Sequence, residues 1–186
     1  TAISDTSQAF LLVDSSGASG VTGGDDHMVS GYIANTTTLT FQRGAAPATA
    51  VNITYSLVEC FNSEFSVQRG EITIAAGSGS NTATITSVDT TKSMVIVSSR
   101  TADTTAVEDE ALVTGELQTA TTVLVQRAVS TGTSAAYVRY EVVEFSTASG
   151  ASIQTGQATL ASGNSSVTAT ITSVTTGRAW IYCSWD

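Results

Sequence analysis

Two short acidic runs are the first candidates for chemistry in this chain. Asp25 and Asp26 form one run, and residues 108–110, with Asp109 and Glu110, form the other. Hard cations such as Ca²⁺ bind several carboxylate and carbonyl oxygens, so these four residues are weak candidates for calcium ligands. Neither run has the DxDxDG-like spacing of a calcium-binding loop. We therefore expect solvated, charged loops here, and we predict no metal and no cofactor.

The single histidine is the next candidate. His27 follows Asp26, an order that could orient an imidazole as a general base. A catalytic dyad also needs a nucleophile, and no recognisable motif places a serine or cysteine for that role. We therefore predict that the protein is not an enzyme.

The two cysteines, Cys60 and Cys183, lack the CxxC or Cys–His spacing of a zinc site. Both stand where related segments of the chain carry apolar residues, so burial as small hydrophobic side chains is one expectation. A disulfide, within one chain or between subunits, is the other.

Composition excludes some classes of partner. The chain has 186 residues with 16 acidic and 7 basic side chains, a net charge of −9, and only one lysine, Lys92. A phosphate backbone is bound by clustered Lys and Arg, so we expect no nucleic acid as a partner. A basic membrane anchor is excluded for the same reason, and no apolar stretch approaches the ~20 residues of a membrane span.

The elements that position these residues come from a duplicated sequence. The heptapeptide Thr82–Val88 recurs letter for letter as Thr168–Val174, 86 residues later. Gly70 is matched by Gly156 at the same offset, Tyr55 by Tyr140 at 85, and Gly31 by Gly115 at 84. A co-linear series with so small a drift indicates duplication of a unit of about 85 residues.

A third, partial copy lies at the start of the chain. The segment 5–13 aligns with 89–97 and with 175–183. The sequence therefore holds two full units and three copies of one apolar segment. If each unit needs that segment once, one copy is left to pair with a neighbouring subunit, because an unpaired apolar strand has to be covered.

Within each unit the local pattern is typical of β-structure. Residues 51–57 alternate apolar and polar side chains, as half-buried strands do, and Gly, Ser and Asn clusters such as 76–81 separate the runs. Residues 14–26 resemble a flexible connector. We predict strands near residues 8–13, 29–34, 38–43, 51–59, 65–67, 71–75, 82–87 and 93–98, repeated about 85 residues later.

These patterns predict an all-β protein of two tandem, duplicated antiparallel β-sandwich units, immunoglobulin-like or jelly-roll-like. We predict four segments, namely an N-terminal strand and connector, a first sandwich, a linker and a second sandwich: 1–27, 28–99, 100–111 and 112–186.

The residues 67–70, 71–74, 82–89 and 92–97 together resemble repeat modules of tailed-bacteriophage virion structural proteins, found in capsid-decorating, collar and tail-associated proteins. The resemblance covers most of both units, although Arg69 and Asp89 are replaced by Thr155 and Thr175 in the second. It implies a non-enzymatic virion component, first of all a capsid decoration or cement protein, with copies of itself and other virion proteins as partners. No catalytic residues come with it.

Contacts with neighbouring subunits are expected at both ends of the chain. Such contacts would use strand edges and apolar side chains. The expected contact residues are Phe10, Leu11, Leu12, Trp180, Tyr182 and Trp185. The alternatives are a tail or collar protein, a receptor-binding module that recognises glycans through an aromatic cluster, and a secreted bacterial surface domain pair, which would be extracellular rather than part of a virion.

Overall fold

The computed structural model describes residues 2–17, 27–44, 50–101 and 110–185. Over these residues the chain is all-β: every strand pairing is antiparallel, and no helix reaches seven residues. The strands are β1 (Ala9–Gly17), β2 (Ser30–Asn35), β3 (Thr38–Gln42), β4 (Val51–Glu59), β5 (Phe65–Ile74), β6 (Ser80–Thr84), β7 (Ser93–Thr101), β8 (Thr114–Thr119), β9 (Thr122–Gln126) and β10 (Ala136–Phe145). Short 3-10 turns include η1 (Thr6–Gln8), η4 (Thr147–Ser149) and η5 (Thr176–Arg178).

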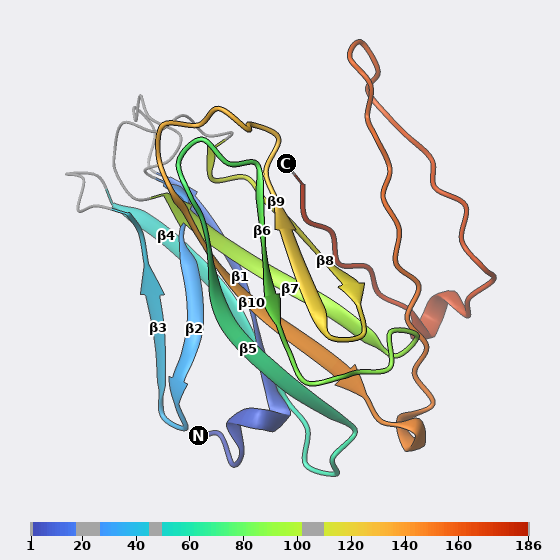
Figure 1. Cartoon of the computed structure of the whole chain (residues 1–186). Coiled ribbons are helices and arrows are strands. Elements are labelled where there is room, and N and C mark those ends of the chain that lie inside the picture. Colours follow the sequence, from blue (N-terminus) through green and yellow to red (C-terminus); the bar gives the residue numbers. More distant parts are fainter. Residues whose placement is uncertain (1, 18–26, 45–49, 102–109, 186) are drawn as a thin grey trace.

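Six strands form one complete sandwich (Figure 1). Its two sheets have the strand orders β5-β10-β7 and β6-β9-β8. The first repeat copy supplies β5, β6 and β7, and the second supplies β8, β9 and β10. The two copies are therefore interlocked, since β10 lies between two strands of the other copy.

The core of the complete sandwich follows from the alternation along its central strands. Val138, Tyr140 and Val142 of β10 point into it and are at most 8% exposed, and Val123 and Val125 of β9 are fully buried. Alternate residues of a strand face the same side, so the apolar positions of these strands form one continuous core.

Glycine in β5 makes room for the largest of these side chains. Gly70 lies opposite Tyr140 in the β5–β10 pairing. A Cβ atom on Gly70 would lie 2.6–2.8 Å from the Tyr140 ring and hydroxyl. Any larger residue would clash with the ring, so the tyrosine and the glycine are complementary in shape.

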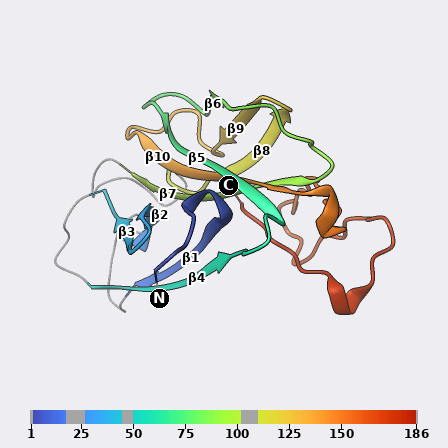
Figure 2. The same ribbon diagram turned by 90° about the horizontal axis from the view of Figure 1, so that it is seen from below.

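The other four strands form a smaller sandwich of the same design. β1 pairs with β4, and β2 pairs with β3. By sequence, β1, β2, β3 and β4 correspond to β7, β8, β9 and β10 of the complete sandwich. Figure 2 shows the β1-β4 sheet as a third layer, beyond β5-β10-β7 and β6-β9-β8.

Two apolar clusters hold the smaller sandwich in place. One lies between the β1-β4 sheet and the outer face of β5-β10-β7 and includes Phe10, Phe65 and Val143, with the Phe10 and Phe65 ring centroids 5.2 Å apart. The other lies inside the smaller sandwich, where Leu11 of β1 packs against Ile33 of β2. Opposite faces of β1 therefore serve two cores.

The glycines at repeat positions 31 and 115 have the same structural role. A Cβ atom on Gly31 would lie 2.6 Å from Val13 Cγ2, and one on Gly115 would overlap Val97 Cγ1. Val13 and Val97 are themselves repeat equivalents. The close approach of β2 to β1 is thus repeated by β8 and β7, and the duplication extends to side-chain packing.

The all-β, antiparallel sandwich architecture is confirmed, with two differences in the strands. The predicted strands at 65–67 and 71–75 are one strand, β5. The strands predicted after residue 151, by analogy with β5, β6 and β7, are wrong: residues 151–185 contain no strand. The physical reason is that a strand needs an edge to pair with, and the equivalent edges in the complete sandwich are taken by β5, β6 and β7.

The predicted segment boundaries fall partly outside the described residues. Of the expected connector, residues 14–17 belong to β1, and 18–26 are not described. Of the predicted linker 100–111, residues 102–109 are not described. The pairing of β10 with β5 and β7 joins the two repeat copies in one sheet.

Helices in the described part of the chain are too short and too polar to cross a lipid bilayer.

Candidate assembly surfaces

The inner face of β4 is open where the equivalent face of β10 is closed. Ile53, Tyr55 and Leu57 are the repeat equivalents of the three inward-facing residues of β10, and they are 36%, 53% and 37% exposed. The strand β10 has a partner on each side, whereas β4 has β1 alone among the described strands. The same apolar alternation that forms a core in one sandwich therefore forms a surface in the other.

The strand β3 also lacks a second strand partner in the described part of the chain. It pairs only with β2 in the described part of the chain, while its equivalent β9 lies between β6 and β8. Leu39 and Phe41 of β3 are half-buried, and their equivalents in β9 are fully buried. The smaller sandwich therefore lacks counterparts of β5 and β6. We use the name open side for the two free strand edges together with the half-buried Leu39 and Phe41 and the exposed Ile53, Tyr55 and Leu57.

The C-terminal segment, residues 151–185, carries the missing sequences without a strand partner. Leu160 and Ile171 are 54% and 61% exposed, whereas their equivalents Ile74 and Ile85 are 0% and 9% exposed in the core of the complete sandwich. In Figures 1 and 2 this segment extends from the end of β10 on the side of the molecule away from β2 and β3. Ile153 and Tyr182 pack against the cluster around Phe10, whereas Leu160 and Ile171 remain exposed.

The C-terminal segment nevertheless keeps part of the conformation that joins β5 to β6, two consecutive strands that lie in different sheets. We use the word hairpin for this strand–turn–strand unit, residues 65–86 in the first copy and 151–172 in the second. The Gln154 side chain accepts from Thr172 N at 2.7 Å and donates to Thr172 O at 3.1 Å. Gln68 and Thr86 make the same pair of bonds, at 2.8 and 3.0 Å. Gly163 also repeats the left-handed φ of Gly77, so the turn is the same. These bonds preorganise residues 151–172 in a strand-compatible hairpin.

The residues predicted for subunit contacts have different environments. Phe10 and Leu11 are buried in the two clusters on opposite faces of β1, and Leu12 packs against the cluster of Phe10. Trp180 and Trp185 are exposed. Their role in contacts between subunits stays a prediction. The sequence alone did not predict the open side on β3 and β4. It did contain a signal, because the apolar segment 5–13 occurs three times whereas the hairpin 65–86 occurs only twice.

Tyr182, the remaining predicted contact residue, binds the free edge of β7 within the same chain. Its hydroxyl accepts from Val97 N at 2.9 Å and donates to Val97 O at 3.1 Å. Burial raises the pKa of the Tyr182 phenol, and the Val97 N–H partly opposes this shift. The phenol therefore stays protonated at neutral pH and can make both bonds.

A partly buried ion pair fixes β1 on the middle sheet. Arg69 Nε lies 3.0 Å from Glu141 Oε1, Glu141 Oε2 accepts from Leu11 N at 2.7 Å, and Arg69 Nη2 donates to Ala9 O at 2.6 Å. Burial raises the pKa of the Glu141 carboxyl, while the Leu11 N–H and the Arg69 charge act in the opposite direction. The pair satisfies backbone groups on the edge of β1 that has no strand partner.

The direction of the Glu141 shift predicts a pH dependence. A carboxyl whose pKa is higher in the folded than in the unfolded chain binds its proton more readily when folded, so it stabilises the fold increasingly as the pH falls from neutral toward the unfolded value. The wild type should gain stability relative to Glu141→Gln as the pH falls from about 7 to about 4.5. Urea unfolding of both proteins at several pH values measures this difference. A free energy of unfolding of the wild type that falls relative to that of Glu141→Gln over this range contradicts the prediction.

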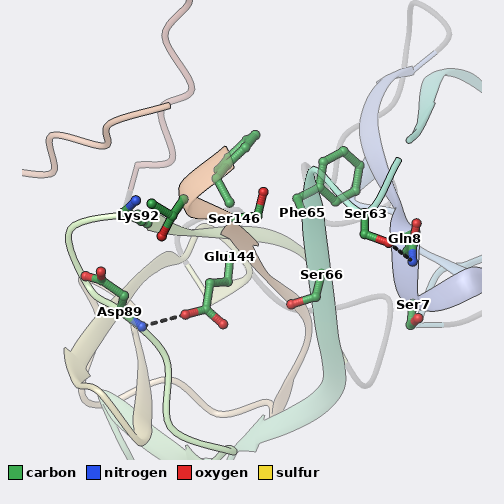
Figure 3. Close-up of a pocket in the computed structure, with 11 residues that line it drawn as sticks. Ser7, Gln8, Ser63, Phe65, Ser66, Asp89, Lys92, Glu144 and Ser146 are labelled. Atoms are coloured by element: carbon green, nitrogen blue, oxygen red, sulfur yellow. Dashed lines mark hydrogen bonds between the residues drawn. The ribbon is translucent and has the colours of Figure 1, made fainter. Parts of the chain in front are cut away.

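An open, polar hollow of about 350 Å³ lies where η1, β5 and the end of β10 meet (Figure 3). Its ionisable side chains are Asp89, Lys92 and Glu144. Glu144 accepts from Asp89 N at 2.7 Å, and Asp89 accepts from Thr91 N and Oγ1, which lowers the Asp89 pKa. The carboxylates thus bind the chain's own turn, and the hollow contains no cysteine or histidine that could act as a nucleophile or base.

The acidic candidates do not form a metal site in the described part of the chain. Asp25, Asp26 and Asp109 lie outside the described residues, and no group of three potential ligands occurs within them. Glu110 is buried, and its carboxylate accepts from Thr133 N at 2.7 Å and Ser134 N at 3.0 Å. It therefore holds a loop.

The remaining candidates for chemistry are the two cysteines and the histidine. Cys60 is a buried free thiol and Cys183 an exposed one, so the two are not bonded to each other. The Ser15 hydroxyl donates to the backbone carbonyl oxygen of His27 at 2.6 Å and not to the His27 imidazole. This contact does not form a nucleophile–base pair.

Comparison of the chain with protein-family models, with curated protein sequences and with solved structures finds no match.

Proposed function

We propose that this chain is a non-enzymatic structural protein of a tailed-bacteriophage virion, with decoration or cementing of the capsid as its first candidate role. Its partners are copies of itself and other virion proteins. The sequence resemblance supplies the virion context. The observation that carries an assembly role is the coexistence of two unfinished apolar surfaces, the open side and the C-terminal segment.

Physical chemistry supports a role in assembly. Exposed apolar side chains next to unpaired strand edges are an aggregation hazard unless a partner covers them. The glutamine–backbone bonds order the C-terminal segment, and the Arg69–Glu141 ion pair holds β1, the strand that pairs with β4. A preorganised surface loses less conformational entropy when a partner binds, so binding is stronger.

The mass of the full-length protein in solution tests the assembly role. Light scattering over a range of concentrations should show species heavier than the 19.0 kDa chain, both with and without reductant. Reductant is included because an exposed Cys183 could link chains by a disulfide instead. Antibody labelling of phage particles in the electron microscope tests the virion location. Monomers under every condition, together with unlabelled particles, would contradict the proposal.

A second candidate is a glycan-recognising module, favoured by the exposure of Trp180 and Trp185 in the C-terminal segment. Exposed aromatic rings offer flat apolar faces on which sugar rings can pack. Binding of the monomeric chain to immobilised glycans, lost in Trp180→Ala or Trp185→Ala, would favour this function.

A further inference from the structure

We infer that residues 151–172 of one copy complete the smaller sandwich of a second copy, adding one strand to the free edge of β4 and another to the free edge of β3. The inference deepens the proposed function and rests on it in one respect, that copies of the chain assemble with each other. It names the partner, the segment and the register. The complete sandwich is an internal template for the incomplete one.

The smaller sandwich already contains every part of the template except one hairpin. Its strands β1 to β4 stand for β7 to β10. Ile3 N donates to Thr36 O at 2.6 Å, just as Val88 N donates to Ala120 O at 2.9 Å, so the chain leading into β1 is also in place. The missing part corresponds to residues 65–86, which form β5 and β6.

The sequence contains this hairpin twice. Residues 65–86 are built into the complete sandwich, and residues 151–172 have no strand partner. The second hairpin has the same glutamine–backbone bonds and the same glycine turn as the first. Its exposed Leu160 and Ile171 match the residues that fill the core of the template. The occupant of the open side is therefore a hairpin of this chain, whose turn and glutamine–backbone bonds already match those of the template.

The template fixes the register of both new pairings. In the complete sandwich, Ala136 pairs with Ile74 and Tyr140 with Gly70. The repeat offsets convert these pairs to Val51 with Leu160 and Tyr55 with Gly156. In the second sheet, Asn81 with Val125 becomes Val167 with Phe41 by the same conversion. Apolar residues of the hairpin thus meet apolar residues of the open side.

The fit of Tyr55 to Gly156 is the most specific feature of this register. Gly70 accommodates the Tyr140 ring, and no atom lies within 4 Å of a Cβ built on Gly156. Tyr55 is 53% exposed, although its equivalent Tyr140 is buried. Tyr55 therefore lacks a glycine to pack on, and Gly156 lacks a tyrosine. Together they would form the packing motif that Tyr140 and Gly70 form in the complete sandwich.

The geometry of the chain favours a second copy over its own hairpin. In both Figure 1 and Figure 2 residues 151–172 lie on the side of the molecule opposite β2 and β3. Donor and acceptor surfaces are different and lie on different sides, so each copy can donate to one neighbour and accept from another. Such a contact is head-to-tail and generates a ring or an open filament.

Cross-linking between two full-length variants tests the partner and the register together. One chain carries Asn52→Cys and the other Thr159→Cys. These positions are the repeat equivalents of Tyr137 and Thr73, which lie opposite each other in the template. Both chains carry Cys183→Val, because valine stands at the equivalent positions 13 and 97. Oxidation of the mixture should give a disulfide-linked dimer. The matched control, Asn52→Cys mixed with Thr155→Cys, should give little, because residue 155 is expected opposite Ser56.

Alanine at Gly156 tests the packing motif. The monomer has open space at this position, so Gly156→Ala should leave the unfolding midpoint of the monomer unchanged, while its methyl group should clash with Tyr55 of the second copy. We expect association to weaken about tenfold or more by light scattering. Gly177→Ala is the matched control, because Gly177 also has no neighbouring atom within 4 Å but lies outside the donated hairpin.

The outcomes separate this inference from the proposed function. Assembly with a 52–159 cross-link that Gly156→Ala abolishes would support both. Assembly that is unaffected by Gly156→Ala and shows no 52–159 cross-link would overturn strand donation and leave the assembly role standing. A cross-link found only within a single chain carrying both cysteines would overturn the second copy as the partner. A chain that stays monomeric at all concentrations, without the mixed cross-link, would overturn the inference.

Discussion

Replacing Arg127 with methionine is expected to destabilise the fold by about 3–5 kcal/mol, the usual cost of removing one partner from a buried charged network. Arg127 is 4% exposed and donates to the carbonyl oxygens of Ala75, Ser78, Glu110 and Ser134 at 2.9–3.1 Å. Methionine keeps most of the volume and removes every donor. Buried acceptors without donors, and a buried Glu110 carboxylate beside them, account for the loss.

Urea unfolding of the variant measures this effect. The matched control is Arg178→Met, which removes the same charge from an exposed residue at the end of η5 and should change the free energy of unfolding by less than about 0.5 kcal/mol. Equal losses in both variants would show that net charge, not the buried network, sets the stability.

Replacing Tyr140 with alanine should destabilise the monomer by about 3–5 kcal/mol, the range for removing a large aromatic side chain from a core. The equivalent change Tyr55→Ala should cost less than half as much. Tyr140 is 8% exposed and fills the space above Gly70, whereas Tyr55 is 53% exposed and packs mainly against Phe41, at 5.5 Å between ring centroids. Tyrosine at the same repeat position is thus expected to contribute differently to the free energy of unfolding in the two sandwiches.

The comparison is made by chemical denaturation at a protein concentration where light scattering reports monomers, because assembly would bury Tyr55 as well. Similar losses for the two variants would mean that the open side is covered within the single chain. The free energies of unfolding of Tyr140→Ala and Tyr55→Ala therefore also show whether the smaller sandwich is incomplete in the monomer.

Much of the fold could be predicted from local sequence. Alternation placed the strands from β1 to β4 and from β7 to β10 within a few residues, since the period of two depends on the residues themselves. Repeated glycines also carried structural information: Gly31 and Gly115 mark the same close approach of two strands. The sequence pattern did not identify the open side, because Ile53, Tyr55 and Leu57 have the same types as the core residues of β10.

The duplication, the strand sequences and the glycine turns are determined by the sequence alone, because each depends on residue type and spacing. Only the tertiary structure decided which strands have partners. Pairing is a long-range property, and β10 of one repeat fills the edges of β5 and β7 of the other. Identical alternation therefore gives a buried core around β10, an exposed face on β4 and, in residues 151–172, a hairpin without a sheet.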